Sequence, residues 1–423
     1  MRVVVVGQGY VGLPLAVYAA EAGHQVVAYD TDVSRIKQLS IGETYIDDMP
    51  PERIRRLLDD GALHATSDAR DLTSFDIAVI AVPTPLTDGV PDLSCVDSAA
   101  VTLAGALRPG AAVVLESTTY PGTTRNRVGA LLEQHSGLIA GQGFHLGFSP
   151  ERTDPGNPDW NLTNTPKLVA GVDQASLDVL CSFYRTFVNR VVPVSGCEEA
   201  EYAKLLENTF RHVNIALINE MAALGHELGI DVWESMDAAA SKPFGFMKFT
   251  PGPGVGGHCL PIDPQYLSWH SWRTLGRRSR FIELADEINT DRPLQVVRRI
   301  TQALNDRKMA VNRARVLLLG LSYKKNIRDT RESPTIRVVR ELVRLGADVR
   351  VADPHVPPGT EMPDIPMHRV TRVDCEPSTL AASDVTVLLT DHDRFDYEDI
   401  ATHSAYVLDC RRRLPALEHV EYL

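Results

Sequence analysis

The chain has 423 residues, enough for two to four domains at roughly 100–200 residues each. Its apolar content of 44% and charged content of 23% are ordinary for a globular protein. A formal net charge of -12 argues against a general nucleic-acid binder, which would carry an excess of basic residues.

The same survey argues against a membrane protein and a disulfide-rich protein. No run approaches about 18 consecutive apolar residues, so we expect no membrane span. The N-terminus enters a strand at once, without the architecture of a signal peptide. The six cysteines form no CxxC pair and no tight cluster, so we expect neither a disulfide framework nor a metal site. These features favour a reducing cytoplasm.

The first thirty residues carry the clearest pattern. The β-branched run at 2–7 predicts a buried strand, residues 13–23 predict a helix, and 24–30 predict a second strand ending at Asp30. GQGYVG joins the first strand to the helix in the pattern G-x-G-x-x-G. The glycines of this motif are Gly7, Gly9 and Gly12. Strand, glycines, helix and terminal acid together indicate a dinucleotide-binding fold.

Each part of this motif has a physical role in binding NAD. Glycines let the backbone approach the pyrophosphate, which sits at the positive end of the helix. Asp30 would accept hydrogen bonds from the adenosine ribose and would repel a 2′-phosphate, so NAD is favoured over NADP. Arg35 could lie near the adenosine or could be a solvated helix charge. The first cofactor contacts we expect are Gly7, Gly9, Tyr10, Val11, Gly12, Asp30 and Arg35.

Three further segments each predict a strand followed by a loop: FDIAVIAVPTP, AAVVLESTTYPGTT and HLGFSPERTDPG. Ligands of open parallel sheets bind beyond the carboxyl ends of the strands. Thr84, Thr118 and Glu151 fall at such ends. Helix capping and turn chemistry are the alternative interpretation of these three side chains.

A long helix is predicted over residues 198–229, which contain no proline. At 1.5 Å per residue it would span about 48 Å, more than a crossover helix needs. Such a helix suits a domain connector and the spine of a dimer. Lys204, Asn208 and Arg211 share one face of it, either as functional groups or as a solvated polar face.

PGPGVGGHCLPID, residues 251–263, places four glycines just ahead of Cys259. The segment is either a loop with an ordinary buried cysteine or a reactive thiol brought close to a ligand by bare backbone. A further helix is expected over 280–305.

The C-terminal third repeats the pattern of the first domain. RVLLLG, residues 315–320, echoes RVVVVG, and GADVRVAD, residues 346–353, echoes GHQVVAYD. The intervening segment is longer in the second copy and carries SYKKNIRDTRESPT in place of the glycine motif. With VTVLLTD and AYVLDC as further strands, this part predicts a second Rossmann-like domain with a parallel sheet.

Seven motifs in order resemble the nucleotide-sugar 6-dehydrogenase family, which comprises UDP-glucose and GDP-mannose dehydrogenases and their UDP-N-acetylhexosamine relatives. The motifs are GQGYVG, VPTP, ESTTYPGTT, FSPER, KLLENTFR, GVGGHCLPIDP and SYKKNIRDTRESP. The resemblance covers essentially the whole chain. It implies an α/β fold of two Rossmann-like, doubly wound parallel-sheet domains joined by a long central helical connector. The expected domains are 1–197 for NAD binding, 198–305 for dimerisation and substrate, and 306–423 for the nucleotide sugar.

The family oxidises the C6 hydroxyl of a nucleotide-linked hexose to a carboxylate and reduces two NAD⁺. The resemblance implies that Cys259 is the thiol nucleophile and that Lys204 is the cation beside it. The remaining residues implied at the reacting centre are Asn208, Asp263, Thr118 and Glu151. Because a thiolate is the nucleophile, a nearby cation would help to form it. Whether Asp263 or Glu151 handles the protons of hydrolysis stays open.

Further binding residues follow from the same resemblance. Thr84, Thr118 and Arg331 are expected at the cofactor. The expected substrate contacts are Glu151, Arg152, Lys204, Asn208, Arg211, Phe249, Gly252, Gly256, Tyr323, Lys324 and Arg411. Phe249 either stacks on the nucleobase or packs within the protein.

The segment SPERTDPGN, with NTFR and PGPGVGGHC, resembles the UDP-N-acetylglucosamine and N-acetylmannosamine branch. UDP-glucose and dTDP-glucose remain alternative substrates. A non-catalytic NAD-binding regulator and a one-step NAD dehydrogenase are alternative functions, although the latter would need no covalent thiol. We expect a cytoplasmic homodimer that binds no nucleic acid and no membrane.

Overall fold

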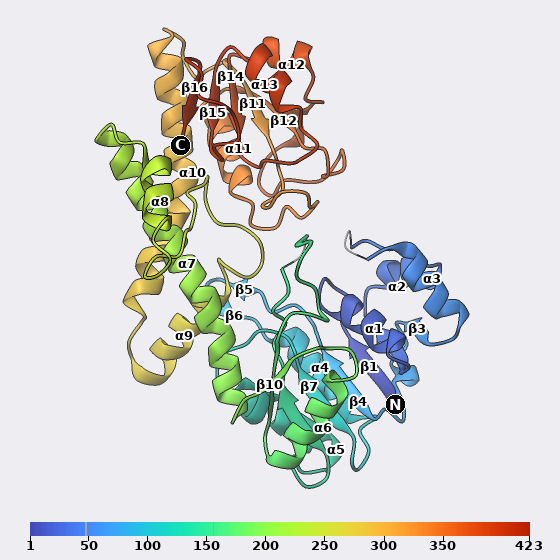
Figure 1. Ribbon diagram of the computed structural model, residues 1–423. Coiled ribbons are helices and arrows are strands. Elements are labelled where there is room, and N and C mark those ends of the chain that lie inside the picture. The colour runs from blue at the N-terminus through green and yellow to red at the C-terminus, as the bar shows by residue number, and fades with distance from the viewer. Residues whose placement is uncertain (47–48, 155) are drawn as a thin grey trace. The chain divides into compact units, whose positions relative to one another are not determined.

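Figure 1 shows the computed structural model, which describes residues 1–46, 49–154 and 156–423. The chain divides into two compact units. The first comprises Met1–Glu207 with Gln265–Arg277, and the second comprises Asn208–Pro264 with Arg278–Leu423. In the described residues, no helix combines the length and the apolar character that crossing a membrane requires.

Over its described residues, the first unit is built on an eight-stranded sheet in the order β10-β9-β8-β7-β4-β1-β2-β3. The strands are β1 (Arg2–Val6), β2 (Gln25–Tyr29), β3 (Leu63–Thr66), β4 (Ile77–Ile80), β7 (Ala112–Leu115), β8 (His145–Phe148), β9 (Lys167–Gly171) and β10 (Val191–Pro193), with a separate hairpin of β5 (Leu86–Thr87) and β6 (Val90–Pro91). The helices are α1 (Gly12–Glu21), α2 (Val33–Ser40), α3 (Pro51–Asp59), α4 (Ser94–Ala104), α5 (Ala130–Ser136), α6 (Gln174–Tyr184) and α9 (Asp263–Leu275), together with 3₁₀ segment η1 (Ala69–Leu72) and π-helical segment η2 (Thr124–Gly129). β1 pairs in parallel with β2 and β4, as the strand–helix–strand pattern predicted.

One pair of strands departs from the expected parallel sheet. β8 and β9 are antiparallel, with Gly147 opposite Gly171. No helix lies between these strands in the described residues of 149–166, and an antiparallel return needs no crossover helix. The sheet is therefore mixed at the side that carries β9 and β10.

Over its described residues, the second unit contains a six-stranded, wholly parallel sheet in the order β13-β12-β11-β14-β15-β16. The strands are β11 (Arg315–Leu319), β12 (Asp348–Ala352), β13 (Val370–Arg372), β14 (Val385–Leu388), β15 (Val407–Asp409) and β16 (Val420–Tyr422), of which β13 and β16 were not predicted. The helices are α8 (Val232–Ala240), α10 (Arg280–Asp306), α11 (Pro334–Arg344), α12 (Pro377–Ala381) and α13 (Tyr397–His403), with 3₁₀ segment η3 (Met367–Arg369).

Alternating residues of β11 enter two different cores. Val316 and Leu318 pack with α10 and α11, whereas Leu317 and Leu319 pack with Leu380 and Ile400 from α12 and α13. Strands that are apolar on both faces need helices on both sides. The predicted fold class, with two Rossmann-like sheets and a long central helix, α7 (Cys197–Glu227), is confirmed.

The two sheets repeat one local geometry. Gly7 and Gly320 both have φ +93°, a value that favours glycine. The amide of Gly7 donates to the carbonyl of Tyr29 at 2.8 Å, and that of Gly320 donates to Ala352 at 2.8 Å. The echo between the two sequence copies is therefore an echo of structure, although the second copy lacks the glycine motif.

The first part of α7 is fastened to the loop after β7 by Glu201. This wholly buried carboxyl accepts hydrogen bonds from the amides of Gly122 and Thr124, at 2.6 and 2.8 Å, and from the Thr124 hydroxyl. Burial raises the pKa of Glu201 to about 7 against the opposing effect of these donors. The clamp fixes the turn of α7 that precedes Lys204.

Candidate functional site

The glycine motif of the first unit divides into a packed part and an open part. A Cβ on Gly12 would lie 1.8 Å from the carbonyl oxygen of Gly7, so helix and strand could not keep this approach with any side chain there. A Cβ on Gly9 would meet nothing within 4 Å. Gly9 therefore leaves bare backbone facing open space at the start of α1, which fits the pyrophosphate of a dinucleotide.

Asp30 directly follows β2, which ends one residue earlier than predicted, and is 7% exposed. Its Oδ2 accepts from the Gln8 amide and from Arg35 Nη1, both at 2.7 Å. Arg35 also lies over the Tyr45 ring, 5.4 Å from its centroid, and the Tyr45 hydroxyl donates to the Gln8 carbonyl. Arg35 is thus paired with the Asp30 carboxylate rather than being a freely solvated charge. Tyr45 was missed, since nothing in its sequence setting marks it.

The other predicted cofactor residues of this unit lie around the same strand ends. Tyr10 and Val11 are half-buried in the turn before α1, and Thr84 is buried in the loop after β4. Half-buried Thr118 follows β7. The loops after β4 and β7 are joined by the Ser117 hydroxyl, which accepts from the Val82 amide at 2.9 Å.

Glu151 belongs to a buried charged cluster. Its Oε1 accepts from the amides of Arg152 and Thr153 at 2.7 and 2.6 Å, and its Oε2 lies 3.5 Å from Lys167 Nζ. Lys167 is 3.0 Å from Glu116, to which the Tyr184 hydroxyl donates at 2.5 Å.

The charges of this cluster sustain one another. Burial would raise the pKa of Glu151, but Lys167 and the amide donors hold it below its usual value. Burial would lower the pKa of Lys167, but the nearby carboxylates of Glu116 and Glu151 outweigh this effect and raise the pKa of Lys167. Burial also raises the pKa of Glu116. Lys167 and Glu116 were missed, although a charged residue directly adjoining an apolar strand, as in AAVVLE and KLVAG, is a usable signal.

In the second unit, the glycines of the thiol loop, residues 251–263, pack against the C-terminal domain. A Cβ on Gly256 would lie 2.7 Å from Tyr323 Cβ, and a Cβ on Gly257 would lie 2.7 Å from the Tyr323 ring. The Gly257 amide donates to the Arg331 carbonyl at 3.0 Å. Cys259 follows, and its side chain is exposed. The glycines therefore hold the loop against Tyr323 while the thiol stays accessible.

Gly252, at the other end of the loop, is held from three sides. Its amide donates to Asn219 Oδ1 at 3.0 Å, and its carbonyl accepts from Arg292 Nε at 2.9 Å. A Cβ there would lie 2.9 Å from Arg411 Nη1. Burial lowers the pKa of Arg292 to about 10. Asn219 and Arg292 were missed, and their only signal is a polar residue within a helical apolar pattern.

Asn208 and Asp263 are brought together as expected. Asn208 Nδ2 donates to Asp263 Oδ2 at 2.6 Å, and both side chains are buried. The Asp263 amide donates to the Cys259 carbonyl at 2.8 Å. Lys204 is on the same helix as Asn208 and is 8% exposed.

The remaining predicted residues have varied settings. Arg152 pairs with Glu207 at 2.5 Å, and Arg211 is exposed on α7. Phe249 packs edge-on against Phe210, with ring centroids 5.9 Å apart, which favours the packing interpretation of this ring.

In the C-terminal domain, Tyr323 and Lys324 are half-buried in the loop after β11, and Arg331 Nη2 lies 2.6 Å from Asp329 Oδ2. Arg411 follows β15. Its Nε donates to the Leu389 carbonyl at 2.7 Å, and its amide donates to buried Asp409 at 2.8 Å. Both side chains of the Arg411–Asp409 turn are thereby fixed by backbone partners.

The glycine turn and strand-end acid of the first unit define a dinucleotide-binding oxidoreductase fold, and comparison with known sequences gives the family. The chain belongs to the UDP-glucose/GDP-mannose dehydrogenase family. It matches the NAD binding domain over residues 1–188, the central domain over 198–291 and the UDP binding domain over 317–416. NAD is thus the cofactor, and the chain is an NAD-dependent dehydrogenase.

Individual relatives extend over nearly the whole chain. The UDP-N-acetyl-D-mannosamine dehydrogenase of Pyrococcus horikoshii is 36% identical over 93% of this chain and 90% of its own length. The UDP-N-acetyl-D-glucosamine 6-dehydrogenase of Pseudomonas aeruginosa is 36% identical over 84% of this chain and 83% of its own length. A solved structure of the UDP-D-ManNAc dehydrogenase from Pyrococcus horikoshii superposes with a TM-score of 0.90 and 33% identity, covering 100% of this chain and 99% of that one.

The two glycines of the NAD motif should respond differently to alanine. Gly12→Ala should lower the thermal unfolding midpoint, because overpacking of this kind costs about 1–3 kcal/mol. Gly9→Ala should leave that midpoint unchanged but weaken NAD⁺ binding about tenfold or more, an effect of about 1.4 kcal/mol. Thermal denaturation and calorimetric NAD⁺ titration test both. Unaltered NAD⁺ affinity in Gly9→Ala, or unaltered stability in Gly12→Ala, would contradict this division of roles.

Lys167→Met should destabilise the first unit strongly, because it leaves Glu116 and Glu151 buried without their cation. Loss of one partner from a buried charge pair costs roughly 3–5 kcal/mol. Adding Glu116→Gln should recover part of that loss by removing one buried charge. The unfolding midpoints of the single and double variants measure the effect, with exposed Lys37→Met as the matched control. A Lys167→Met midpoint equal to that of Lys37→Met would refute the charge cluster.

Proposed function

We propose that the chain oxidises the C6 hydroxyl of a nucleotide-linked hexose to a uronate in two NAD-linked steps, through a thioester on Cys259. The observation that carries the proposal is the exposed thiol at the end of a glycine loop packed on Tyr323. Asp263, whose amide donates to the Cys259 carbonyl, is hydrogen-bonded to Asn208.

The chemistry requires a thiol because an aldehyde alone cannot lose a second hydride readily. The Cys259 thiolate adds to the C6 aldehyde and gives a thiohemiacetal, whose C–H bond can be oxidised to leave a thioester. Bound NAD supplies the acceptor for each hydride. Water then breaks the C–S bond and restores the thiol. In balance, one hexose, one water and two NAD⁺ give one uronate, two NADH and three protons.

Two carboxylates are candidates for taking the proton of the hydrolytic water. Glu151 has Oε1 engaged by two amides and Oε2 beside Lys167, and its lowered pKa makes it a weak base. We therefore assign proton acceptance to Asp263, which Asn208 orients. Lys204 would stabilise the thiolate and the oxyanion at C6.

For the substrate, we propose a UDP-N-acetylhexosamine. The relatives from Pyrococcus horikoshii and Pseudomonas aeruginosa carry UDP-N-acetyl-D-mannosamine and UDP-N-acetyl-D-glucosamine in their names, and both align over most of the chain. UDP-glucose or dTDP-glucose is the second candidate. A non-catalytic regulator is disfavoured, because it would not need the exposed thiol of Cys259.

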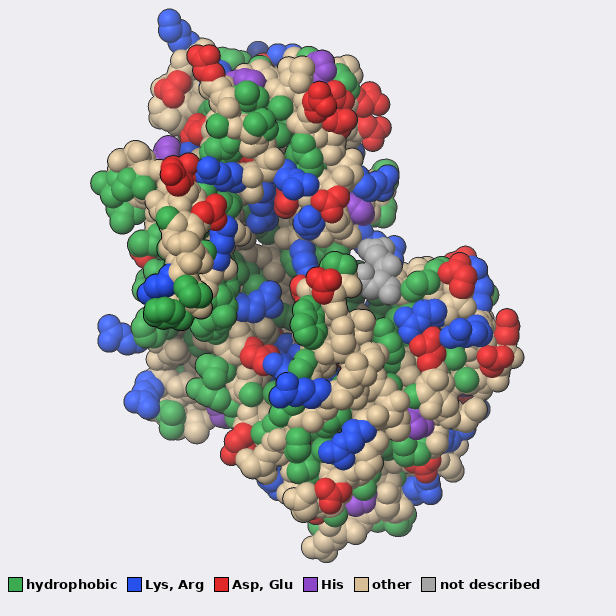
Figure 2. All heavy atoms as spheres, in the orientation of Figure 1, with side chains coloured by type: hydrophobic (Ala, Val, Ile, Leu, Met, Phe, Trp, Pro, Cys, Tyr) green, Lys and Arg blue, Asp and Glu red, His purple; other side chains and the backbone are tan. Residues whose placement is uncertain are grey.

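We also propose a homodimer in the cytoplasm. One face of α7 in the second unit exposes apolar side chains at helical spacing, namely Phe210, Leu217, Met221 and Leu224, and exposed Leu228 directly follows the helix. Phe281 and Leu284 of α10 are 73% and 53% exposed. Figure 2 shows hydrophobic side chains among the charged ones on the surface of the molecule. A contiguous apolar surface of this kind suits burial against a second copy. None of the six cysteines, all of which lie in the described part of the chain, forms a disulfide, which fits a reducing compartment.

The reaction predicts two NADH for each sugar consumed, with a UDP-N-acetylhexosamine turned over faster than UDP-glucose, dTDP-glucose or GDP-mannose. NADH absorbance across such a panel, with the product acid identified by mass spectrometry, measures this. Cys259→Ser should form no uronate, while Cys95→Ser, at another exposed cysteine, should behave as wild type. Near-normal acid formation by Cys259→Ser would exclude the covalent route.

The dimer predicts that Leu217→Glu combined with Leu224→Glu converts the protein to a monomer, because two buried charges would oppose association. Light scattering gives the mass. Leu417→Glu, which places the same charge on an exposed leucine outside α7, is the matched control. A wild-type protein that is monomeric at micromolar concentration would overturn this assignment.

A further inference from the structure

Asp353 occupies in the second domain the place that Asp30 occupies in the first. Each follows the second strand of its sheet, and each accepts a hydrogen bond at 2.7 Å from the amide after the φ +93° glycine: Gln8 for Asp30 and Leu321 for Asp353. In the first domain this carboxylate belongs to the NAD motif. The second domain has kept the carboxylate without the motif.

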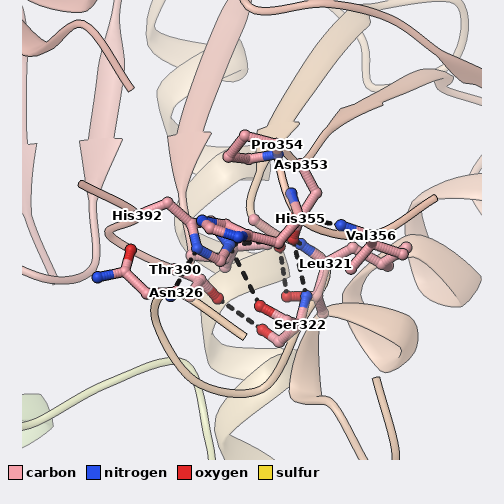
Figure 3. A network of polar contacts seen from close by, with 12 residues as sticks. Leu321, Ser322, Asn326, Asp353, Pro354, His355, Val356, Thr390 and His392 are labelled. Atoms are coloured by element: carbon pink, nitrogen blue, oxygen red, sulfur yellow. Dashed lines mark hydrogen bonds and ion pairs between the residues drawn. The ribbon is translucent and has the colours of Figure 1, made fainter. Parts of the chain in front are cut away.

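Unlike Asp30, Asp353 has no accessible acceptor. Its side chain and that of His392 are both 0% exposed, and His392 Nε2 lies 3.0 Å from Asp353 Oδ2. The same Oδ2 accepts from the Ser322 amide at 3.0 Å, and Oδ1 accepts from the amides of His355 and Val356 at 2.8 and 3.0 Å (Figure 3). Both carboxylate oxygens of Asp353 therefore accept hydrogen bonds from the protein itself, and the side chain has a structural role.

The other nitrogen of His392 reveals that purpose. Nδ1 faces the Asn326 amide at 2.9 Å, and because a backbone N–H can only donate, Nδ1 must accept (Figure 3). The ring hydrogen is then on Nε2, where it points to Asp353. Asp353 thus sets the tautomer that lets His392 hold Asn326. Asn326 has φ 61°, a left-handed conformation that asparagine tolerates and that needs outside support.

Two hydroxyls complete the anchor of the segment 321–326. Thr390 Oγ1 donates to the Ser322 carbonyl at 2.7 Å, and Ser322 Oγ donates to the Lys324 carbonyl at 2.9 Å. The segment is therefore held by hydrogen bonds at Leu321, Ser322, Lys324 and Asn326. Because these residues lie on both sides of Tyr323, they fix the backbone of Tyr323.

Tyr323 connects the anchored segment 321–326 to the thiol loop by direct contact. Its Cβ and ring are the atoms against which Gly256 and Gly257 pack, two to three residues before Cys259. A displacement of the 321–326 segment would move the surface on which those glycines rest.

We propose that His392, oriented by Asp353, is a positioning residue for the thiol loop and acts through Asn326 and Tyr323. In terms of the reaction, this inference rests on the proposed function of Cys259. In the second domain, the carboxylate at the position of Asp30 thus supports the loop that carries the thiol. His392 itself touches neither the thiol loop nor, by its burial, any substrate.

Two isosteric variants separate the two nitrogens of His392. In His392→Asn the amide oxygen stands near the place of Nδ1, so the bond from Asn326 is kept and the donor to Asp353 is lost. In His392→Gln the amide nitrogen reaches the place of Nε2, so the donor is kept and the acceptor is lost. If His392 only satisfied Asp353, Asn would be the more damaging change. The proposal predicts the opposite order.

The first measurement is steady-state kinetics with a UDP-N-acetylhexosamine. His392→Gln should lower kcat roughly ten- to a hundredfold, the effect of a small misplacement of reacting groups, with KM for NAD unchanged. His392→Asn should retain most of the wild-type kcat. Thr390→Val, which removes one anchoring hydroxyl with little change of shape, should lower kcat less than His392→Gln and keeps the test valid if a histidine variant fails to fold.

The second measurement, hydrogen exchange of the peptide 251–263, does not depend on catalysis. Exchange should be faster than wild type in His392→Gln and Thr390→Val but not in His392→Asn, while the peptide 2–29 should be unchanged in all three. Unchanged exchange of 251–263 in both His392→Gln and Thr390→Val, or greater damage in His392→Asn, would overturn the proposal. If the wild-type protein oxidises no nucleotide sugar, the proposed function fails and the exchange result still decides the role of His392.

Discussion

Contact between the bare backbone of Gly256–Gly257 and the Tyr323 side chain is the constraint on which the second unit depends. A Cβ at either glycine would come within 2.7 Å of Tyr323, so no other residue fits without moving the loop. The contact fixes the thiol loop from one side, while Asn219 and Arg292 hold Gly252 from the other. Backbone groups of Gly252, Gly256 and Gly257 make these contacts, and Cys259 stays exposed.

The two Rossmann-like domains share the geometry of the turn after their first strand. Each uses a φ +93° glycine and a strand-end aspartate to shape the first turn. In the first domain the turn leaves open space at Gly9, whereas in the second the corresponding loop is long, basic and pinned by buried groups. The two domains thus share one local geometry at this turn but differ in the loop that follows it.

Most helices and strands of the fold could be predicted from the sequence, because the patterns that indicate them involve neighbouring residues. Apolar strand runs, the glycine motif and the proline-free helix after residue 197 each depend on neighbouring residues, and they appear where expected. The antiparallel return of β9 and the edge strand β16 depend on partners far away in the chain, so periodicity could not reveal them.

The candidate site divides in the same way. Cys259, Asp30 and the Asn208–Asp263 pair stand in recognisable motifs. No motif marks the pairs Lys167–Glu116 and His392–Asp353. Their members are 51 and 39 residues apart in the sequence, so the contact within each pair is evident only in the folded structure. Buried charges at strand ends were the missed signal, since a carboxylate is stable there only with a partner.

The central claim is that the sugar is held covalently by Cys259 during oxidation. Rapid acid quenching of a single turnover, followed by mass spectrometry of the peptide 251–263, tests it most directly. The account predicts a transient adduct with the mass of the uronyl nucleotide sugar on Cys259, rising and decaying in step with the formation of NADH and acid. Acid formation at the full rate with no adduct on that peptide at any time would contradict it.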